Sequence, residues 1–413
     1  MTAPADASTS TDAATRRRVL GIGSGAHFVH DGLSSVLYLL LPVWQAEFAL
    51  TLTQVGLVRS VYSGAMALLQ VPAGLLSEHW GERLLLGAGT VVTGLAYMTL
   101  GLAGGHLTLM AVLVVGGAGA TVQHPLSSSV ISKAYEHGPH RSALGIYNFS
   151  GDLGKMAIPF IVAMAIPVFE WRWATIGVGA FGIAAGIVTY LLLRGLGVGG
   201  PSAKVAKKNP TGDSQTAHVS GWGIIDHTGF GALSAIGVID GAGRSGFLTF
   251  LPFLLIGKGA DVEIVGVALT LTFIGGATGK FFCGLLAERL GIIRTVILTE
   301  AITGIGILAL LPLSLYWAMA LLPVIGMGLN GTSSVLYGTV SDFVAPERRA
   351  RGFGLFYTLA VGGSAIAPFM FGMLSDVMGV TMTLTMVALL ALSTIPICRL
   401  LVRPLSRAQA GSV

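Results

Sequence analysis

The sequence is short of charged residues. Only 10% of its 413 residues are Asp, Glu, Lys or Arg, whereas a typical soluble domain carries about 25%. Hydrophobic residues make up 53%, and the mean hydropathy is +0.79. A water-soluble fold could not bury so much apolar surface, so the chain is expected to have the lipid bilayer as its solvent and partner.

Cysteine is nearly absent, and two common catalytic motifs are missing. The only cysteines, Cys283 and Cys398, lie far apart in apolar segments, so we expect core residues and neither a disulfide framework nor a metal centre. No G-x-x-x-x-G-K-[ST] loop and no HExxH pattern occurs, which argues against an ATP-driven pump and a zinc hydrolase. No cofactor and no enzymatic activity are expected.

The charge balance is basic. A net charge of +5 and a pI near 9.3 could indicate a nucleic-acid partner. The Lys and Arg residues instead stand in short runs between long apolar stretches and form no basic face, so we expect no nucleic acid.

The apolar stretches are long enough for transmembrane helices, which need about 20 residues each. Twelve can be delimited, at 20–46, 54–77, 84–104, 107–132, 143–168, 173–194, 222–256, 263–287, 293–314, 317–341, 352–374 and 380–402. The sequence thus predicts an all-α membrane protein with a disordered cytoplasmic tail at 1–19, a six-helix bundle at 20–195, a cytoplasmic linker at 196–221, a second six-helix bundle at 222–403 and a cytoplasmic tail at 404–413.

The loop charges predict how the chain crosses the membrane. With the N-terminus in the cytoplasm, 18 of the 24 Lys and Arg residues fall on the cytoplasmic side, and only Arg172 and Lys258 fall on the other. Cytoplasmic loops of membrane proteins carry such an excess of positive charge. We therefore expect a multi-pass protein of the cell membrane with both termini in the cytoplasm.

The two groups of six spans repeat at an offset close to 210 residues. The segment GLLSEHWGER at 74–83 returns as GLLAERLGIIR at 284–294, and Asp31-Gly32 in the first span is matched by Asp240-Gly241 in the seventh. Duplicated halves are typical of transporters that expose a mid-membrane site alternately to the two sides.

The repeated segment resembles the loop signature G-x-x-x-D-R-x-G-R-R of the major facilitator superfamily. Asp342 and Arg348 resemble a second family loop, between spans 10 and 11. Glu78 stands where the family has Asp. The resemblance implies two pseudo-symmetric six-helix bundles, and it implies gating roles for Gly74, Glu78, Gly81, Arg83, Gly284, Glu288, Arg289, Asp342 and Arg348.

Shorter motifs resemble the fosmidomycin-resistance-type exporters of this superfamily, which are drug:proton antiporters. They are His27-Phe-Val-His30-Asp31-Gly32 in the first span, Gln54-Val-Gly56-Leu57 in the second and Gln123-His124-Pro125 in the fourth. This resemblance implies efflux of a toxic compound, as in antibiotic resistance, in exchange for protons. The superfamily resemblance places spans 1, 4, 7 and 10 around a central cavity.

The first span carries ionisable residues inside the membrane, where a charge costs on the order of 3 kcal/mol on insertion scales. His27, His30 and Asp31 are spaced i, i+3 and i+4 and share one helix face. A histidine beside a carboxylate can bind and release protons near neutral pH. We assign proton coupling to these three residues and to Asp240, the repeat counterpart of Asp31. Purely structural pairing is the alternative.

The other embedded charges are mostly basic, which favours an anionic substrate. The pairs Asp152–Lys155 and Asp240–Arg244 either neutralise themselves or release the base for an anion when the acid is protonated. No role is assigned to Glu300 in the ninth span. The candidate substrate-binding residues are Arg59, Gln123, His124, Asp152, Lys155, Arg244, Lys280 and Asn330.

Together these residues predict a monomeric, proton-coupled secondary transporter that exports a small anionic or amphipathic compound by alternating access. Its expected partners are that small molecule and protons. The same residues would serve a proton symporter that imports an organic acid or a phosphate ester, and the sequence leaves the direction open. A membrane enzyme built on His124 and Ser127 is a weaker alternative, because no nucleophile motif supports it.

Overall fold

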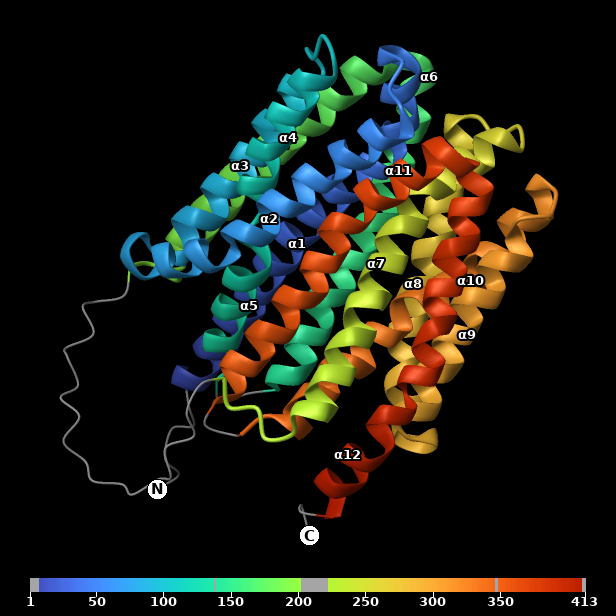
Figure 1. Ribbon diagram of the computed structural model, residues 1–413. Coiled ribbons are helices and arrows are strands. Elements are labelled where there is room, and N and C mark those ends of the chain that lie inside the picture. The colour runs from blue at the N-terminus through green and yellow to red at the C-terminus, as the bar shows by residue number, and fades with distance from the viewer. Residues whose placement is uncertain (1–6, 137–138, 202–221, 346–347, 411–413) are drawn as a thin grey trace, which may run out of the picture. The chain divides into compact units, whose positions relative to one another are not determined.

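The computed structural model describes residues 7–136, 139–201, 222–345 and 348–410 (Figure 1). Within these ranges the protein consists of helices, and the only strand-like pairing is an isolated bridge between Ile224 and Val344. Most of the predicted linker, the extreme ends of both tails, and Pro346 and Glu347 of the loop between spans 10 and 11 lie outside the described residues.

The described part of the chain contains twelve spans. α6 (His140–Gly195) and α11 (Arg349–Ile397) each hold two helices, joined at Glu170 (φ 61°) and Gly379 (φ 80°). α4 (His106–Ala120) and α5 (Gln123–Ala134) together form one span. The other spans are α1 (Ala7–Phe48), α2 (Leu52–Trp80), α3 (Glu82–Leu100), α7 (His227–Gly257), α8 (Val262–Leu290), α9 (Ile292–Leu310) and α10 (Leu315–Thr339). The 3₁₀ helix η1 (Val340–Phe343) follows α10, and α12 (Arg399–Ala410) follows α11.

Hydropathy agrees with this count. Among the described residues, eight helices are long and apolar enough to cross a membrane, with α4 and α5 taken as one and with α6 and α11 each containing two spans. α1 and α2 complete the twelve, and their hydropathy is lower because they carry His27, His30, Asp31 and Arg59. The predicted all-α membrane architecture is confirmed.

The break between α4 and α5 has a local cause in Pro125. Proline has no N–H, so it cannot donate a hydrogen bond to the carbonyl of Thr121 four residues earlier. Helical bonding resumes at Leu126, whose N–H donates to the carbonyl of Val122 at 3.1 Å. The interruption places Gln123 and His124 in the first turn of a new helix.

The helix boundaries repeat at an offset of 210 residues. α2 and α8 both have 29 residues and begin at 52 and 262, while α3 and α9 both have 19 residues and begin at 82 and 292. Gly81 and Gly291 precede α3 and α9 with φ values of 84° and 85°. That left-handed conformation favours glycine, so the repeated loop motif encodes the same turn in both copies.

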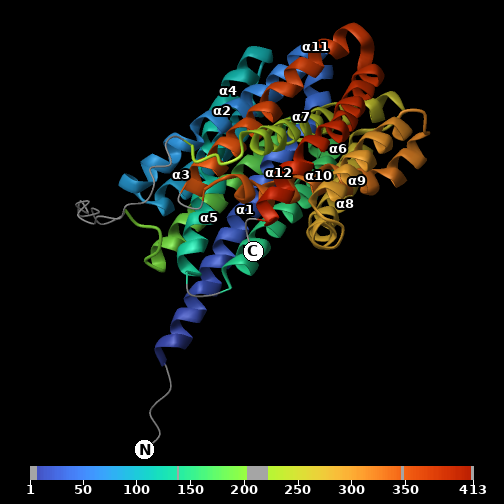
Figure 2. The same ribbon diagram turned by 60° about the horizontal axis from the view of Figure 1, so that its bottom comes forward.

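The helices form two compact units. The first comprises residues 1–37 and 68–206, and the second comprises 38–67 and 207–413. In the first unit α3 packs against α4 and the second helix of α6 (Figure 1), and Figure 2 shows the first turns of α1 extending past the neighbouring helix ends. In the second unit α7 packs against α11, and α10 packs against α8 and α9. The bundle limits at 20–195 and 222–403 stay a prediction.

Both cysteines are buried in the second unit. Cys283 and Cys398 are free thiols, and they belong to one apolar cluster that also contains Phe230, Phe343 and Phe356. Their role is therefore packing, as their apolar surroundings in the sequence predict.

Arg172 and Lys258, the two basic residues predicted on the non-cytoplasmic side, donate hydrogen bonds to equivalent helix ends. Nζ of Lys258 donates to the carbonyls of Leu311 and Leu313 at 2.7 and 2.6 Å, just beyond α9. Nη1 of Arg172 donates to the two carbonyls 210 residues earlier, beyond α3, at 3.3 and 2.8 Å. A cation at a helix C-terminus satisfies free carbonyls and complements the helix dipole.

Replacing either capping residue is expected to destabilise its own unit. Lys258→Gln and Arg172→Gln should each lower the free energy of unfolding by about 1 kcal/mol, seen as a lower thermal midpoint of the purified protein. Arg294→Gln, which removes an exposed positive charge from the first turn of α9, is the control. Midpoints equal to that of the control would contradict the capping role.

Candidate functional site

The buried carboxylate of Asp31 on α1 is the centre of a polar cluster in the first unit. Nζ of Lys155 on α6 lies 2.9 Å from Oδ2, and Nε2 of His27 lies 3.3 Å from the same oxygen. On the other side, Nε2 of His124 on α5 is 3.7 Å from Oδ1, and Nε2 of His30 is 3.9 Å from it. Four of the predicted site residues therefore converge on one acid that is only 4% exposed.

Lys155 is shared between two carboxylates. Its Nζ lies 3.1 Å from Oδ1 of Asp152, one helical turn away, as well as 2.9 Å from Asp31. The sequence predicted only the pair with Asp152. The one ammonium therefore divides its attraction between two buried acids, and a proton on either acid would shift it toward the other.

The ring of His27 is held in one orientation by Tyr147. Nδ1 lies 2.8 Å from the Tyr147 carbonyl, and the two rings stack with centroids 4.1 Å apart. A carbonyl only accepts, so Nδ1 carries the hydrogen. In the neutral ring Nε2 is then an acceptor without a hydrogen-bond partner, facing the Asp31 carboxylate. A proton on Nε2 turns two opposed acceptors into an ion pair, which makes this contact a place for a proton to bind.

Glycines allow α6 to come close to α1 at this point. A Cβ atom on Gly151 would lie 2.5 Å from Cε1 of His27 and 2.6 Å from Oδ2 of Asp31, and one on Gly154 would overlap the carbonyl of Phe28. Small residues permit such helix contacts in membranes. The approach of Lys155 to Asp31 therefore depends on glycine on the α6 surface.

The same cluster offers three ligand atoms for a metal ion. One atom each from His27, Asp31 and His124 lie within 4.8 Å of one another. The ammonium of Lys155, 2.9 Å from Asp31, already supplies the positive charge that a dication would supply and would repel it. The arrangement therefore suits protons better than a metal.

A second cluster lies in the second unit around Asp240. Arg244, one turn further along α7, places Nη2 3.7 Å from Oδ2 of Asp240 and donates from Nη1 to Ser333 on α10 at 3.2 Å. Glu300 on α9 is 2% exposed and lies next to Asp240. Sequence reasoning gave Glu300 no role, although an acid in an apolar span was the available signal.

Arg59 is enclosed by aromatic rings in the second unit. Its Nη2 donates to the hydroxyl of Tyr38 at 2.9 Å, and its guanidinium carbon lies 4.5 and 5.6 Å from the ring centroids of Tyr38 and Tyr62. Cation–π contacts of this kind stabilise a desolvated charge. They account for a guanidinium that is only 8% exposed and that has no acid within one turn of its own helix.

For the remaining predicted binding residues, the contacts that the structure describes are mainly local. The amide of Gln123 donates to Ser127 one turn along α5 at 2.9 Å, and the amide of Asn330 donates weakly to the carbonyl of Gly326 at 3.4 Å. Lys280 is half-buried on α8. These contacts fix the side chains but indicate no ligand.

The loop between α2 and α3 places its charges differently from the family pattern. Glu78 is exposed, whereas Glu82 is buried in the first turn of α3, where it accepts hydrogen bonds from Ser129 and from Lys133, the latter at 2.8 Å. The backbone N–H of Arg83 donates to Gly199 at 2.8 Å. Of the other predicted gating residues, Gly81 is buried, and the rest range from exposed to half-buried: Gly74, Gly284, Glu288, Arg289, Asp342 and Arg348.

Comparison with known proteins agrees with this architecture. The sequence pattern of the Major Facilitator Superfamily matches residues 23–237 and 233–412. The fosmidomycin resistance protein of Escherichia coli (strain K12) is 25% identical over 90% of this chain and 89% of its own length. The hexuronate transporter of Bacillus subtilis (strain 168) is 23% identical over 84% of each chain. The crystal structure of a bacterial homolog to the human lysosomal transporter Spinster, inward-facing and occupied, has 17% identity, a TM-score of 0.68, and covers 96% of this chain and 97% of its own.

A methyl group at position 151 should separate α1 from α6. Gly151→Ala is expected to cost about 1–3 kcal/mol through overpacking and to displace His27 or Asp31, so both thermal stability and transport should fall. Gly145→Ala is the control on the same helix, because a Cβ there meets no atom within 4 Å. Equal behaviour of the two variants would show that the close approach is unimportant.

Proposed function

Because the chain belongs to the Major Facilitator Superfamily and is a multi-pass membrane transporter of small molecules, we propose that it couples the movement of a small anionic compound to that of protons. Lys155 is the anion-binding group and Asp31 the proton carrier. The observation that carries the proposal is the single ammonium of Lys155 held between Asp31 and Asp152.

Protonation of Asp31 is the step that links the two ligands. A neutral Asp31 no longer attracts Lys155, so the ammonium is left with one carboxylate and can bind an anion in its place. The Lys155 side chain is 27% exposed while Asp31 is nearly covered, so the ammonium is the end that a substrate can reach. His27 and His124 supply the polar contacts through which a proton reaches the carboxylate.

The direction of transport follows from whether proton and anion bind together or compete. In this cluster a proton on Asp31 strengthens anion binding, and by linkage the anion strengthens proton binding. Binding together is the requirement of a symporter that imports an acid. The cluster therefore supports import, the alternative direction in the sequence prediction. A relative named as a hexuronate transporter agrees with an organic acid as the substrate.

Efflux by antiport, the leading direction in the sequence prediction, has its support in the likeness to the fosmidomycin resistance protein. Antiport requires that the proton and the substrate exclude each other. A cationic or amphipathic compound attracted to deprotonated Asp31 would compete with the proton in this way.

A panel of phosphonates, carboxylates and cationic drugs, scored for uptake and for growth inhibition with and without an uncoupler, distinguishes import from efflux. Accumulation of an anion that stops with the uncoupler supports the proposal, and resistance to cationic drugs alone would overturn it.

Replacing Asp31 should remove proton coupling without removing substrate exchange. Asp31→Asn is expected to abolish accumulation driven by a pH gradient while retaining part of the exchange between labelled and unlabelled substrate, because the amide stays neutral at every pH. Glu136→Gln, at an exposed acid beyond α5, should behave as wild type. If transport by Asp31→Asn depended on pH as it does in the wild type, Asp31 would not be the proton carrier.

Lys155 should determine the affinity for the anion. Lys155→Gln is expected to raise the half-saturating concentration at least about tenfold, since charge-assisted hydrogen bonds contribute about 1.5–3 kcal/mol, and Lys155→Arg should recover part of the loss. Arg194→Gln, at an exposed base near the end of α6, is the matched charge control. An unchanged half-saturating concentration in Lys155→Gln would place the substrate elsewhere.

A further inference from the structure

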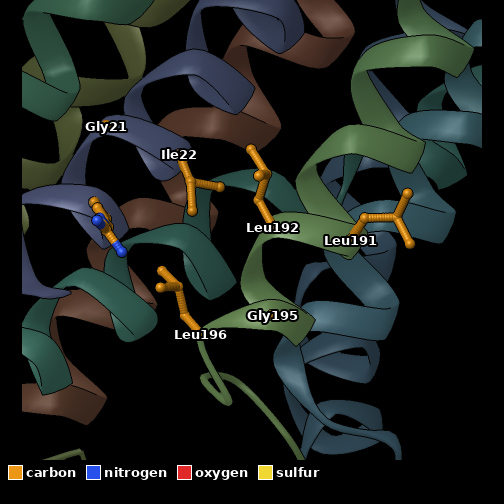
Figure 3. Close-up of a pocket in the computed structure, with 7 residues that line it drawn as sticks. Gly21, Ile22, Leu191, Leu192, Gly195 and Leu196 are labelled. Atoms are coloured by element: carbon orange, nitrogen blue, oxygen red, sulfur yellow. The ribbon is translucent and has the colours of Figure 1, made fainter.

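An apolar groove lies between α1 and the end of α6 in the first unit (Figure 3). Its main part has a volume of about 550 Å³. A second part of about 390 Å³ shares Gly21, Ile22 and Leu192 with it and continues along α1 to Val29. The side chains of Ile22, Leu192 and Leu196 point toward the same space (Figure 3).

Glycines keep the groove open. A Cβ atom built on Gly21, Gly25 or Gly195 would meet no atom within 4 Å, so no protein group fills the space beside them. Leu191 and Leu192 are 53% and 49% exposed. In a transmembrane protein these apolar walls lie against hydrocarbon, and the open volume must be filled by something apolar.

The length of the groove matches one leaflet. From Arg18 to Val29 the helix advances 11 residues, or about 16 Å at 1.5 Å per residue, which is about half of a 30 Å hydrocarbon core. Arg18 lines the main part, and apart from Thr189 in the second part the rest of the lining is apolar. An occupant therefore has a polar head at Arg18 and an apolar chain along α1.

The protein is positively charged around Arg18, where the polar head of an occupant would lie. Arg16, Arg17 and Arg18 are consecutive, Arg194 lies on the opposing helix, and the sequence has no Asp or Glu at 13–30 or at 171–201. Basic residues at the membrane surface select anionic lipids. We propose that this groove binds one acyl chain of an anionic phospholipid, with its phosphate at Arg18.

This lipid would contact the helix that carries the proton cluster. Gly25, Phe28 and Val29 line the groove, while His27 and Asp31 on the same helix face the polar cluster. The site is distinct from the substrate site proposed above, and lipid binding can be measured on purified protein without any substrate.

The first test compares headgroups. Purified protein is loaded with phosphatidylglycerol or phosphatidylcholine of identical chains, and retained lipid is counted by native mass spectrometry. We expect about fivefold greater retention of phosphatidylglycerol, falling to parity in Arg18→Gln. Arg407→Gln, which removes an exposed cation from α12, should keep the preference. Equal retention of both lipids by the wild type would overturn the headgroup assignment. So would an equal loss of the preference for phosphatidylglycerol in Arg18→Gln and Arg407→Gln.

The second test fills the groove. Leucine at positions 21 and 25 meets no atom of the fold at its Cβ, so Gly21→Leu with Gly25→Leu should not lower the thermal midpoint and should displace the retained phosphatidylglycerol. Gly177→Leu, at an exposed glycine on α6 that also has no atom within 4 Å, should retain it. Full retention in the doubly substituted variant would show that the lipid lies elsewhere.

Discussion

The ion pair between Asp31 and Lys155 is the contact on which the first unit's polar interior depends. It joins α1 to α6 at 2.9 Å in a setting where removing one partner of a buried pair typically costs about 3–5 kcal/mol. The glycines at positions 151 and 154 let the two helices meet, and the break before α5 brings His124 to the same carboxylate. Packing and chemistry are therefore not separable here, because the surfaces that bring the helices together also bring a base to an acid.

Much of the architecture could be predicted from the sequence because it depends on local or repeated patterns. Hydropathy predicts the spans, and the duplicated motif predicts turns at Gly81 and Gly291 that the structure reproduces with the same φ. The i, i+4 spacing likewise predicts that His27 and Asp31 lie together. In each case the information lies within one helix or one loop, where backbone geometry determines which side chains are neighbours.

Contacts between helices could not be predicted from the sequence. The spacing of Asp152 and Lys155 predicts their pairing, but not that Lys155 reaches across to Asp31, because that depends on how closely α6 approaches α1. Glu300 and Glu82 show the same limit: each is a buried acid whose polar neighbours lie on another helix. The family signature drew attention to Glu78, whereas burial at the start of α3 makes Glu82 the acid that is paired.

The two copies of the repeat share a backbone and differ in chemistry. Arg172 and Lys258 come from different places in their copies but donate to carbonyls 210 residues apart, so the helix ends are the shared feature. The first copy surrounds its acid with lysine and histidines, while the second gives Asp240 an arginine and another carboxyl group. Asp31 and Asp240 thus occupy corresponding positions in clusters of different charge, and only the first has an ammonium shared by two acids.

The most direct test of this account is the proton count when an anion binds. Purified protein in weak buffer with a pH-sensitive dye is mixed with whichever anion of the panel the wild type transports. Because a proton on Asp31 releases Lys155, binding should take up about one proton per anion by linkage, and Asp31→Asn should take up none. Release of a proton by the wild type, or uptake that persists in Asp31→Asn, would contradict the coupling of Asp31 to Lys155.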